Sequence, residues 1–326
     1  LHFKPATADS VENRFNLYAW LYASRFYRDP ALPAEAWSPC GVMQVAPDAR
    51  LQKRLSKLVQ SDLYDPEILQ VLDAEQASHL AGTDIEHSAA YFPAAGWLNP
   101  KALCAWYARH PGISVRCNSR VLQVEALTEG WQLQVQGPTE QTLLQCRHVI
   151  LCNALDVHTF GQARHIPVIG NRGQVDSYRG AASASNGPVI CGQGYLIPPR
   201  ADGVQCIGGS FFVTDSKDQQ AAASALHLQQ LAAISAPLAA AFTHRYPSEQ
   251  RRASRCTVAD RMPVCGLLSG SAGTEGGLWV NVAHGSQGLA RTPVCATLLD
   301  SHINRTPSPL EACVQEVLAA ERFSTV

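Results

Sequence analysis

The sequence predicts a mixed α/β fold, and three observations lead to this prediction. The stretch from Leu278 to Leu299 has the pattern of a buried strand, a tight turn and an apolar helix. Apolar and aromatic side chains recur at helical spacing from Ser10 to Tyr27. Runs of alternating polarity between Ile113 and Val149 are typical of successive β-strands. Helical and strand segments therefore alternate along the chain, as they do in α/β and α+β domains.

The composition is that of a folded chain with a sizeable core. Of the 326 residues, 46% are hydrophobic and only 16% are charged, which suffices for one large domain or two interleaved ones. The formal net charge of -1 gives no overall field that would attract nucleic acid, so RNA binding would depend on local clusters. Two such clusters are Lys53, Arg54 and Lys57, and Arg251, Arg252 and Arg255. A solvated helix face is the alternative interpretation of such charges.

The cysteines and the lack of targeting signals predict a cytoplasmic protein. The 11 cysteines contain no C-x-x-C pair, and several have apolar neighbours, which favours reduced thiols that pack as small hydrophobes. We find no signal peptide, lipidation motif or apolar run of membrane-spanning length, so no membrane partner is expected. No Cys/His spacing of a metal site occurs either, so no metal is expected.

Periodicity and breaker residues predict the order of the elements. We expect helices over Ser10–Tyr27, Asp48–Gln60, Asp65–Leu72, from Pro100 to Pro111, and over Gln219–Ile234. We expect strands at Gly41–Val45, Ser114–Arg116, Val121–Val124, Trp131–Val135, His148–Cys152, Gly173–Val175, Val189–Cys191, Tyr195–Pro198, Gln205–Gly208 and Leu278–Ala283.

The turn Gly285-Ser286-Gln287-Gly288 is the strongest local sign of a ligand site. It precedes an apolar helix that carries Pro293 near its first turn. Short side chains let backbone N–H groups approach a ligand, and the helix dipole favours negative charge at this end. The sequence therefore predicts an anion or an electron-rich oxygen there. A plain strand-to-helix corner is the alternative.

Several motifs resemble those of a known flavoprotein family. Arg255-x4-Asp260-x2-Pro263-x2-Gly266, followed by the turn from His284 to Leu289, looks like the C-terminal signature of D-amino-acid-oxidase-like flavoproteins. Within that superfamily, further motifs resemble, in order, the FAD-dependent oxidoreductase domain of the MnmC family. These motifs are Gly41-Val42-x-Gln44, Gly96-Trp97-Leu98-x-Pro100, Gly194-Tyr195-Leu196-x-Pro198, Cys206-Ile207-Gly208 and the tail Pro309-Leu310…Arg322-Phe323. The resemblance covers nearly the whole chain.

This resemblance implies an FAD-binding, Rossmann-like domain of the D-amino-acid-oxidase type, with an inserted antiparallel-sheet substrate domain. Residues 1–30, 101–165 and 250–306 would form the FAD-binding domain, 31–100 and 166–249 the substrate-binding domain, and 307–326 a C-terminal tail. The G-x-G-x-x-G unit that opens such domains does not occur here, so we expect a truncated N-terminus and weakened FAD binding. The family also implies a SAM-dependent methyltransferase domain, normally fused N-terminally and lacking in this sequence.

The resemblance also implies a cofactor and its contacts. FAD is the expected cofactor, and the matching positions are Leu1, His2, Val121, Asn153, Ala154, Gly285, Ser286, Gln287, Gly288 and Leu289. Ala154 stands where the family usually has glycine, so its methyl group and stiffer backbone are expected to affect the local fit.

Three residues are candidates for catalysis by the same resemblance. Arg255 matches the position that binds a substrate carboxylate, for which the guanidinium fork is suited. Tyr195 matches a pocket tyrosine, and Gln287 stands where close relatives tend to carry arginine. The alternatives are an Arg255 that braces a domain junction and a Tyr195 that only packs in the sheet. We interpret Asp260 as a structural turn acceptor and His284 as a strand-end histidine rather than a base.

The function implied by the resemblance is that of a cytoplasmic, FAD-dependent enzyme of tRNA modification. Such enzymes oxidise the carboxymethyl group of 5-carboxymethylaminomethyl(-2-thio)uridine at the wobble position of the anticodon loop, which leaves the 5-aminomethyl form. The partner would then be tRNA. Two alternatives stay open: a small-molecule amino-acid oxidase of the glycine or sarcosine type, and a non-catalytic truncated remnant.

Overall fold

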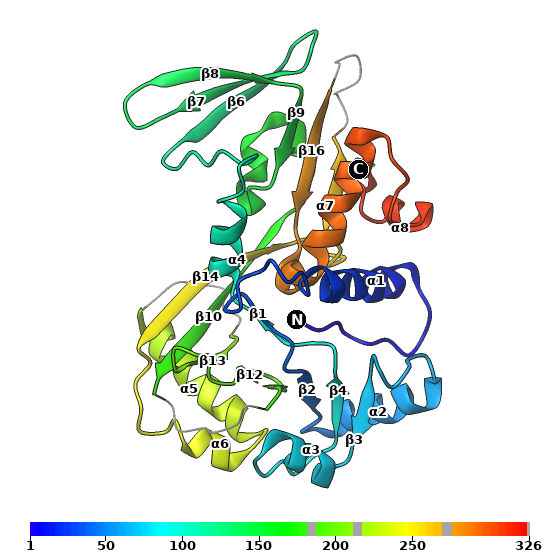
Figure 1. Ribbon diagram of the computed structural model, residues 1–326, viewed down its shortest axis with the longest axis vertical. Coiled ribbons are helices and arrows are strands. Elements are labelled where there is room, and N and C mark those ends of the chain that lie inside the picture. Colours follow the sequence, from blue (N-terminus) through cyan, green and yellow to red (C-terminus); the bar gives the residue numbers. More distant parts are fainter. Residues whose placement is uncertain (181–186, 211–216, 269–275, 325–326) are drawn as a thin grey trace. The chain divides into compact units, whose positions relative to one another are not determined.

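A computed structural model describes residues 1–180, 187–210, 217–268 and 276–324, and these divide into two compact units (Figure 1). Unit 1 comprises Leu1–Asp9, Ser24–Cys104 and Asn171–Ser254. Unit 2 comprises Ser10–Ala23, Ala105–Gly170 and Arg255–Val326. Residues 1–9 and 24–30, which the resemblance assigned to the FAD-binding domain, thus cluster with unit 1. In the described ranges, no helix has the length and apolar character needed to cross a membrane.

Unit 1 is built on a mixed sheet, whose order within the described residues is β14-β10-β13-β12-β11-β2-β4-β3. β11 pairs parallel with β2, whereas β10 and β13, β12 and β13, and β2 and β4 pair antiparallel. The strands are β2 (Val42–Val45), β3 (Gln70–Leu72), β4 (Ala89–Phe92), β10 (Ile169–Arg179), β11 (Val189–Cys191), β12 (Tyr195–Leu196), β13 (Val204–Gly208) and β14 (Glu249–Thr257). A short ribbon pairs β1 (Trp37–Ser38) with β5 (Trp97–Leu98).

Helices cover one face of this sheet (Figure 1). The helices of unit 1 are α2 (Ala49–Ser61), α3 (Ala74–Ala81), α5 (Lys217–Ala232) and α6 (Ala236–Ala240). Met43 and Ile207 of the sheet share a buried apolar cluster with Leu231 of α5 and Phe242, which follows α6. Burial of these side chains holds α3, α5 and α6 on that face. Two further helices, α1 (Val11–Phe26) and α4 (Pro100–Tyr107), contain residues of both units.

Unit 2 contains two three-stranded sheets in its described residues. One consists of β15 (Val264–Leu267), β16 (Gly277–Val282) and β9 (His148–Leu151), and the other of β6 (Arg120–Ala126), β7 (Trp131–Gln136) and β8 (Gln141–Cys146). The helical segments are α7 (Gly288–Asn304), α8 (Ala312–Glu316), η1 (Ala154–Thr159), η2 (Gly161–Ala163), η3 (Gly285–Gln287) and η4 (Ala320–Phe323). β16 pairs parallel with β9 and antiparallel with β15.

The structure confirms the mixed α/β fold and most of the predicted elements. The helix expected over Ser10–Tyr27 is α1, and the one expected over Asp48–Gln60 is α2, which begins where the Asp48 carboxylate accepts a hydrogen bond from the Leu51 N–H. The predicted strand, turn and helix from Leu278 to Leu299 appear as β16, η3 and α7.

Two predicted elements are wrong. The helix expected over Asp65–Leu72 is only a turn, after which Gln70–Leu72 forms β3 and pairs with β4. The helix follows instead as α3, whose capping box between Asp73 and Gln76 was the missed signal. Ser114–Arg116 forms no strand and is exposed, because no neighbouring strand pairs with it among the described residues.

Candidate functional site

Two loops of unit 2 leave the same edge of a sheet. β9 leads into residues 152–154, and β16 leads into residues 283–288. The two strands are parallel neighbours, with Leu151 opposite Val280, so their carboxyl ends lie side by side. Ligands of open α/β sheets bind in the crevice at this edge. The predicted contacts at 153, 154 and 285–289 therefore come together in the fold.

The first turn of α7 has no side-chain cap, since Gln287 at the N-cap position makes no capping bond. Gly285 has a φ of 59°, a left-handed conformation that favours glycine. Gly288 has a helical φ of -52°, and a methyl group there would lie 3.6 Å from its nearest neighbour, His284 Cβ. The chain's own packing therefore does not demand glycine at 288. A bare residue there keeps side-chain bulk away from the first turn of α7, where the helix dipole favours negative charge.

Alanine occupies a left-handed conformation in both loops. Ala154 has a φ of 53° and Ala283 a φ of 63°. This conformation costs a non-glycine residue roughly 1–2 kcal/mol. The backbone of Ala154 thus adopts a conformation that favours glycine, as expected from the family's usual residue there. Backbone strain of this kind at both strand ends is typical of ligand-binding loops.

Each loop also carries a buried hydrogen-bond acceptor that finds no donor among the described residues: Asn153 Oδ1 and His284 Nδ1. His284 Nε2 donates to Asn281 Oδ1 at 2.8 Å, which leaves Nδ1 as the bare acceptor. Burial, and to a lesser degree the charge of Arg291, lower the pKa of His284 to about 4. The imidazole is therefore neutral at neutral pH. Buried acceptors without donors are positions where an ordered water or the hydroxyl or N–H group of a ligand can donate a hydrogen bond.

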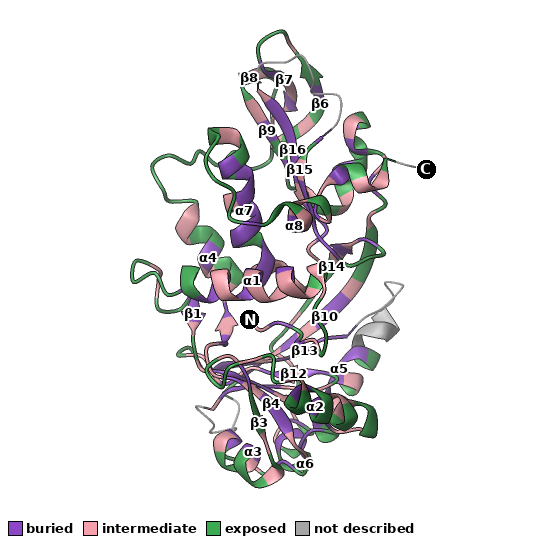
Figure 2. Cartoon of the chain, turned by 90° about the vertical axis from the view of Figure 1, so that its right-hand side faces the viewer, coloured by how far each residue is buried: buried purple, intermediate pink, exposed green. Residues whose placement is uncertain are grey.

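Arg291, in the first turns of α7, is a buried cation with only neutral partners. Arg291 is 7% exposed, and one side of α7 is buried (Figure 2). Nε and Nη2 donate to Asn16 Oδ1 at 3.2 and 2.8 Å, and Nη1 donates to the Arg261 carbonyl at 2.8 Å. No carboxylate of the described residues forms an ion pair with it. Burial lowers the pKa of Arg291, although an arginine stays charged.

The end of β14 lies against the same turn. A Cβ atom on Gly285 would lie 3.5 Å from Thr257 Oγ1. Arg255 is half-buried two residues earlier on β14, and alternation along a strand puts its side chain on the same side as Thr257. The fold thus brings Arg255 into the neighbourhood of the turn that precedes α7.

Asp260 has the structural role expected of it. Its carboxylate accepts hydrogen bonds from the Met262 N–H at 2.8 Å and from Arg322 Nε at 3.0 Å. Arg322 Nη2 also donates to the carbonyls of Met262 and Pro263. The Asp260-Pro263 motif and the tail motif with Arg322, 62 positions apart, are therefore two halves of one contact.

The remaining candidates of unit 2 lie along the same segments. Val121 is partly buried on β6, where it packs on the core cluster of unit 2. Ser286 is exposed, whereas Gln287 and Leu289 are half-buried at the start of α7. Gln287 adds no charge to the turn, so Arg291, four residues further along the helix, is the nearest cation in sequence.

Three candidates belong to unit 1. Tyr195 on β12 pairs with Gly208 on β13, and a Cβ atom on Gly208 would lie 2.6 Å from the Tyr195 hydroxyl, so the ring crosses this glycine. The Leu1 carbonyl accepts a hydrogen bond from the Gly96 N–H at 3.3 Å, and the His2 ring lies 5.7 Å from that of Phe92. The candidates thus form two groups, one in each unit.

The sequence-based predictions missed Arg291 and gave His284 little weight. The only signal for Arg291 was one basic residue in the first turns of an otherwise apolar helix. An arginine is usually exposed at the protein surface, and only the folded structure shows that Arg291 is buried.

Comparison with known proteins places this geometry in context. Residues 3–301 match the family described as FAD dependent oxidoreductase. The chain is 35% identical to the tRNA 5-methylaminomethyl-2-thiouridine biosynthesis bifunctional protein MnmC of Hahella chejuensis, over 99% of this chain and 53% of that protein. The chain is 31% identical to the protein of the same name from Methylobacillus flagellatus, over 99% of this chain and 52% of that protein. The chain therefore spans about half the length of these relatives.

Solved structures share the fold. A glycine oxidase from Geobacillus kaustophilus has a TM-score of 0.75 at 15% identity, over 94% of this chain and 82% of that one. An iminodiacetate oxidase from a Chelativorans species has a TM-score of 0.75 at 18% identity, over 96% and 85%. At these identities the likeness concerns the fold alone.

Proposed function

The chain belongs to the family of FAD-dependent oxidoreductases, and from this premise we propose that it carries out an oxidative step of tRNA wobble-uridine modification. The step is removal of the carboxymethyl group from 5-carboxymethylaminomethyl(-2-thio)uridine, which leaves the 5-aminomethyl form. The names of the two MnmC relatives, which refer to biosynthesis of a modified tRNA uridine, support this proposal.

The single observation that carries the proposal is the sheet edge of unit 2. The uncapped first turn of α7 offers N–H donors and positive potential, while Asn153 Oδ1 and His284 Nδ1 offer buried acceptors. FAD has phosphate groups and electron-rich carbonyl oxygens, and it also has hydroxyl and N–H donors, so these residues fit it. We propose that residues 153–154 and 285–289 hold the cofactor there, with Arg291 adding positive potential. FAD supplies the hydride acceptor.

Arg255 is proposed to bind the substrate carboxylate, and its place near the turn before α7 supports this role. A bidentate contact would orient the carbon between the carboxylate and the nitrogen. A C–H bond of this carbon breaks as its hydride is removed, the nitrogen loses a proton, and water hydrolyses the resulting C=N bond. The products are glyoxylate and the primary amine on the uridine.

Residues 31–100 and 166–249 are proposed to form the substrate-binding domain, with Tyr195 as a contact. The close packing of the Tyr195 ring on Gly208 gives the side chain a fixed direction, which suits a recognition residue. We propose, correspondingly, that most of the FAD contacts come from unit 2.

The test is flavin reduction in a single turnover of the FAD-loaded protein with tRNA that carries the modified uridine. Arg255→Lys keeps the charge but loses the fork, so we expect a rate loss of tens-fold, about 2 kcal/mol. Arg251→Lys, an exposed position on the same strand, is the matched control and should change little. If Arg255→Lys reduces the flavin at the wild-type rate, Arg255 does not bind the substrate carboxylate. Reduction by free N-methylglycine without tRNA would favour the amino-acid oxidase instead.

A further inference from the structure

Helix α2 carries a stripe of positive charge. Its cations follow the spacing i, i+3, i+4 and i+7, which puts them on one side of a helix: Arg50, Lys53, Arg54 and Lys57. The 13-residue helix contains no acidic side chain. We call these four residues the α2 stripe.

No ion pair among the described residues balances the charge of the α2 stripe. Arg50, Lys53 and Lys57 are exposed, and the ion pairs of the described residues involve other side chains. The nearest acid in sequence, Asp48, caps the helix by accepting from the Leu51 N–H. Like charges three and four positions apart destabilise a helix by roughly 0.2–0.5 kcal/mol per pair. The stripe thus repels itself, which an anionic partner would relieve.

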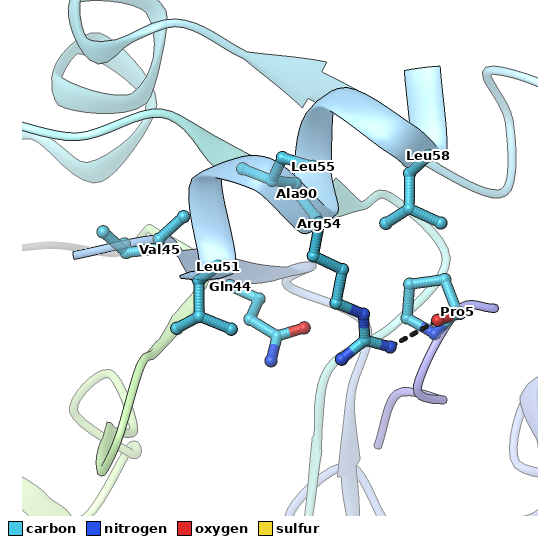
Figure 3. Close-up of a pocket in the computed structure, with 9 residues that line it drawn as sticks. Pro5, Gln44, Val45, Leu51, Arg54, Leu55, Leu58 and Ala90 are labelled. Atoms are coloured by element: carbon cyan, nitrogen blue, oxygen red, sulfur yellow. Dashed lines mark hydrogen bonds between the residues drawn. The ribbon is translucent and has the colours of Figure 1, made fainter. Parts of the chain in front are cut away.

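A neighbouring side of α2 fixes the helix to unit 1 (Figure 3). Leu55 and Leu58 are buried, and Arg54 reaches across to donate a hydrogen bond to the Pro5 carbonyl. Burial, and then repulsion from Arg50, lower the pKa of Arg54. The cavity between these residues measures about 20 Å³, which is room for little more than a water molecule. Any partner of α2 therefore meets the outward charges and not a pocket.

Two observations decide which partner fits the stripe. A membrane-surface helix needs a free apolar face, but Leu55 and Leu58 are already buried in unit 1. The other basic cluster of the sequence is partly engaged, since Arg252 Nε donates to Gln174 Oε1 at 3.2 Å. From residue 50 to 57 the stripe rises about 10 Å, long enough to meet successive phosphates of a nucleic-acid strand.

We propose that the α2 stripe is a docking surface for the phosphate backbone of tRNA, an inference that rests on the proposed function. Arg50, Lys53 and Lys57 contact phosphates, while Arg54 holds the helix through Pro5. Such contacts position the RNA and carry no sequence information.

The test measures the tRNA dissociation constant of the FAD-loaded protein across salt concentrations. The variant Arg50→Gln/Lys53→Gln/Lys57→Gln leaves Arg54 and the apolar face intact. Each lost phosphate contact lowers the slope of log K against log salt by roughly 0.7–1, so we expect a slope lower by about 2–3 and roughly tenfold weaker binding at low salt. The matched control Arg25→Gln/Arg28→Gln/Arg109→Gln removes three other exposed charges and should keep the wild-type slope.

Two further measurements keep the outcome clear. Circular dichroism and thermal unfolding check that the α2 variant is folded. Flavin reduction by the free modified nucleoside should be unchanged in that variant, which separates docking from chemistry. An unchanged salt slope in a folded α2 variant overturns the proposal, as does a loss of binding to phosphatidylserine vesicles with tRNA binding intact. A wild type that binds tRNA with the stripe-dependent slope but never reduces its flavin would refute the proposed reaction and leave the docking surface standing.

Discussion

Two buried charges, Asp176 in unit 1 and Arg291 in unit 2, meet opposite surroundings. Asp176 is fully buried, and its carboxylate accepts hydrogen bonds from His227 Nδ1 at 2.8 Å, Gln174 Nε2 at 2.8 Å and Gln250 Nε2 at 3.4 Å. Arg291 donates to one amide oxygen and one backbone carbonyl.

The pKa of both groups is lowered, which favours the charged form of Asp176 and the neutral form of Arg291. Burial alone would raise the pKa of Asp176, but hydrogen bonds from His227, Ser224 and Gln174 outweigh it, so the surroundings favour the charged carboxylate. Burial lowers the pKa of Arg291, so its surroundings disfavour the charged guanidinium. The first charge is satisfied by the protein itself. The second lies in the first turns of α7, next to the proposed cofactor site, and forms no ion pair with a carboxylate of the described residues.

The largest expected effect is on folding, at Asp176. Replacing Asp176 with Ala leaves several buried donors, among them His227 Nδ1, without their acceptor, so the free energy of unfolding should fall by roughly 3 kcal/mol. Urea denaturation measures this loss. Asp202→Ala removes an exposed carboxylate from its pair with Arg200 and should cost at most about 1 kcal/mol. Equal losses in the two variants would contradict a self-sufficient Asp176 cluster.

A second prediction concerns acid and His284, which folding holds neutral. Its folded pKa of about 4 lies below the ordinary histidine pKa of 6.5, so the unfolded chain binds its proton first as the pH falls. This stabilisation is complete above pH 6.5 and is lost between pH 6.5 and 4. Between pH 7 and 4.5, wild type should lose about 2 kcal/mol more of its unfolding free energy than His284→Gln. If the unfolding free energies of wild type and His284→Gln fall by the same amount over this pH range, folding does not hold His284 neutral.

The smallest effect is at Arg291, where function and not stability should respond. Arg291→Gln removes positive potential, so reduced FAD should be stabilised about tenfold less, a fall in reduction potential of about 30 mV for two electrons. The pKa of His284, followed by NMR in the cofactor-free chain, should rise because a repelling charge is gone. Arg305→Gln, at the other end of α7, is the control. A raised pKa of His284 with an unchanged potential would show that the charge does not reach the flavin.

Sequence alone determined the local parts of this protein. Period and breaker residues predicted α1, α2 and the run from β16 to α7, because these depend on neighbours within a few positions. The motifs also indicated the FAD-dependent oxidoreductase family that the comparison confirmed. The roles proposed for Arg255, Tyr195 and Gln287 stay predictions.

Tertiary structure decided what depends on distant segments. Gln70–Leu72 became a strand because β4 pairs with it, although its own pattern favoured a helix. Asp260 finds Arg322, and Arg291 finds Asn16 275 positions away; neither pairing leaves a periodic trace in the sequence. Burial of Arg291 without a carboxylate is likewise a property of packing. The polarity pattern of a sequence indicates which side chains prefer contact with water. Only the folded chain determines which polar atoms are buried away from water and which protein atoms become their hydrogen-bond partners.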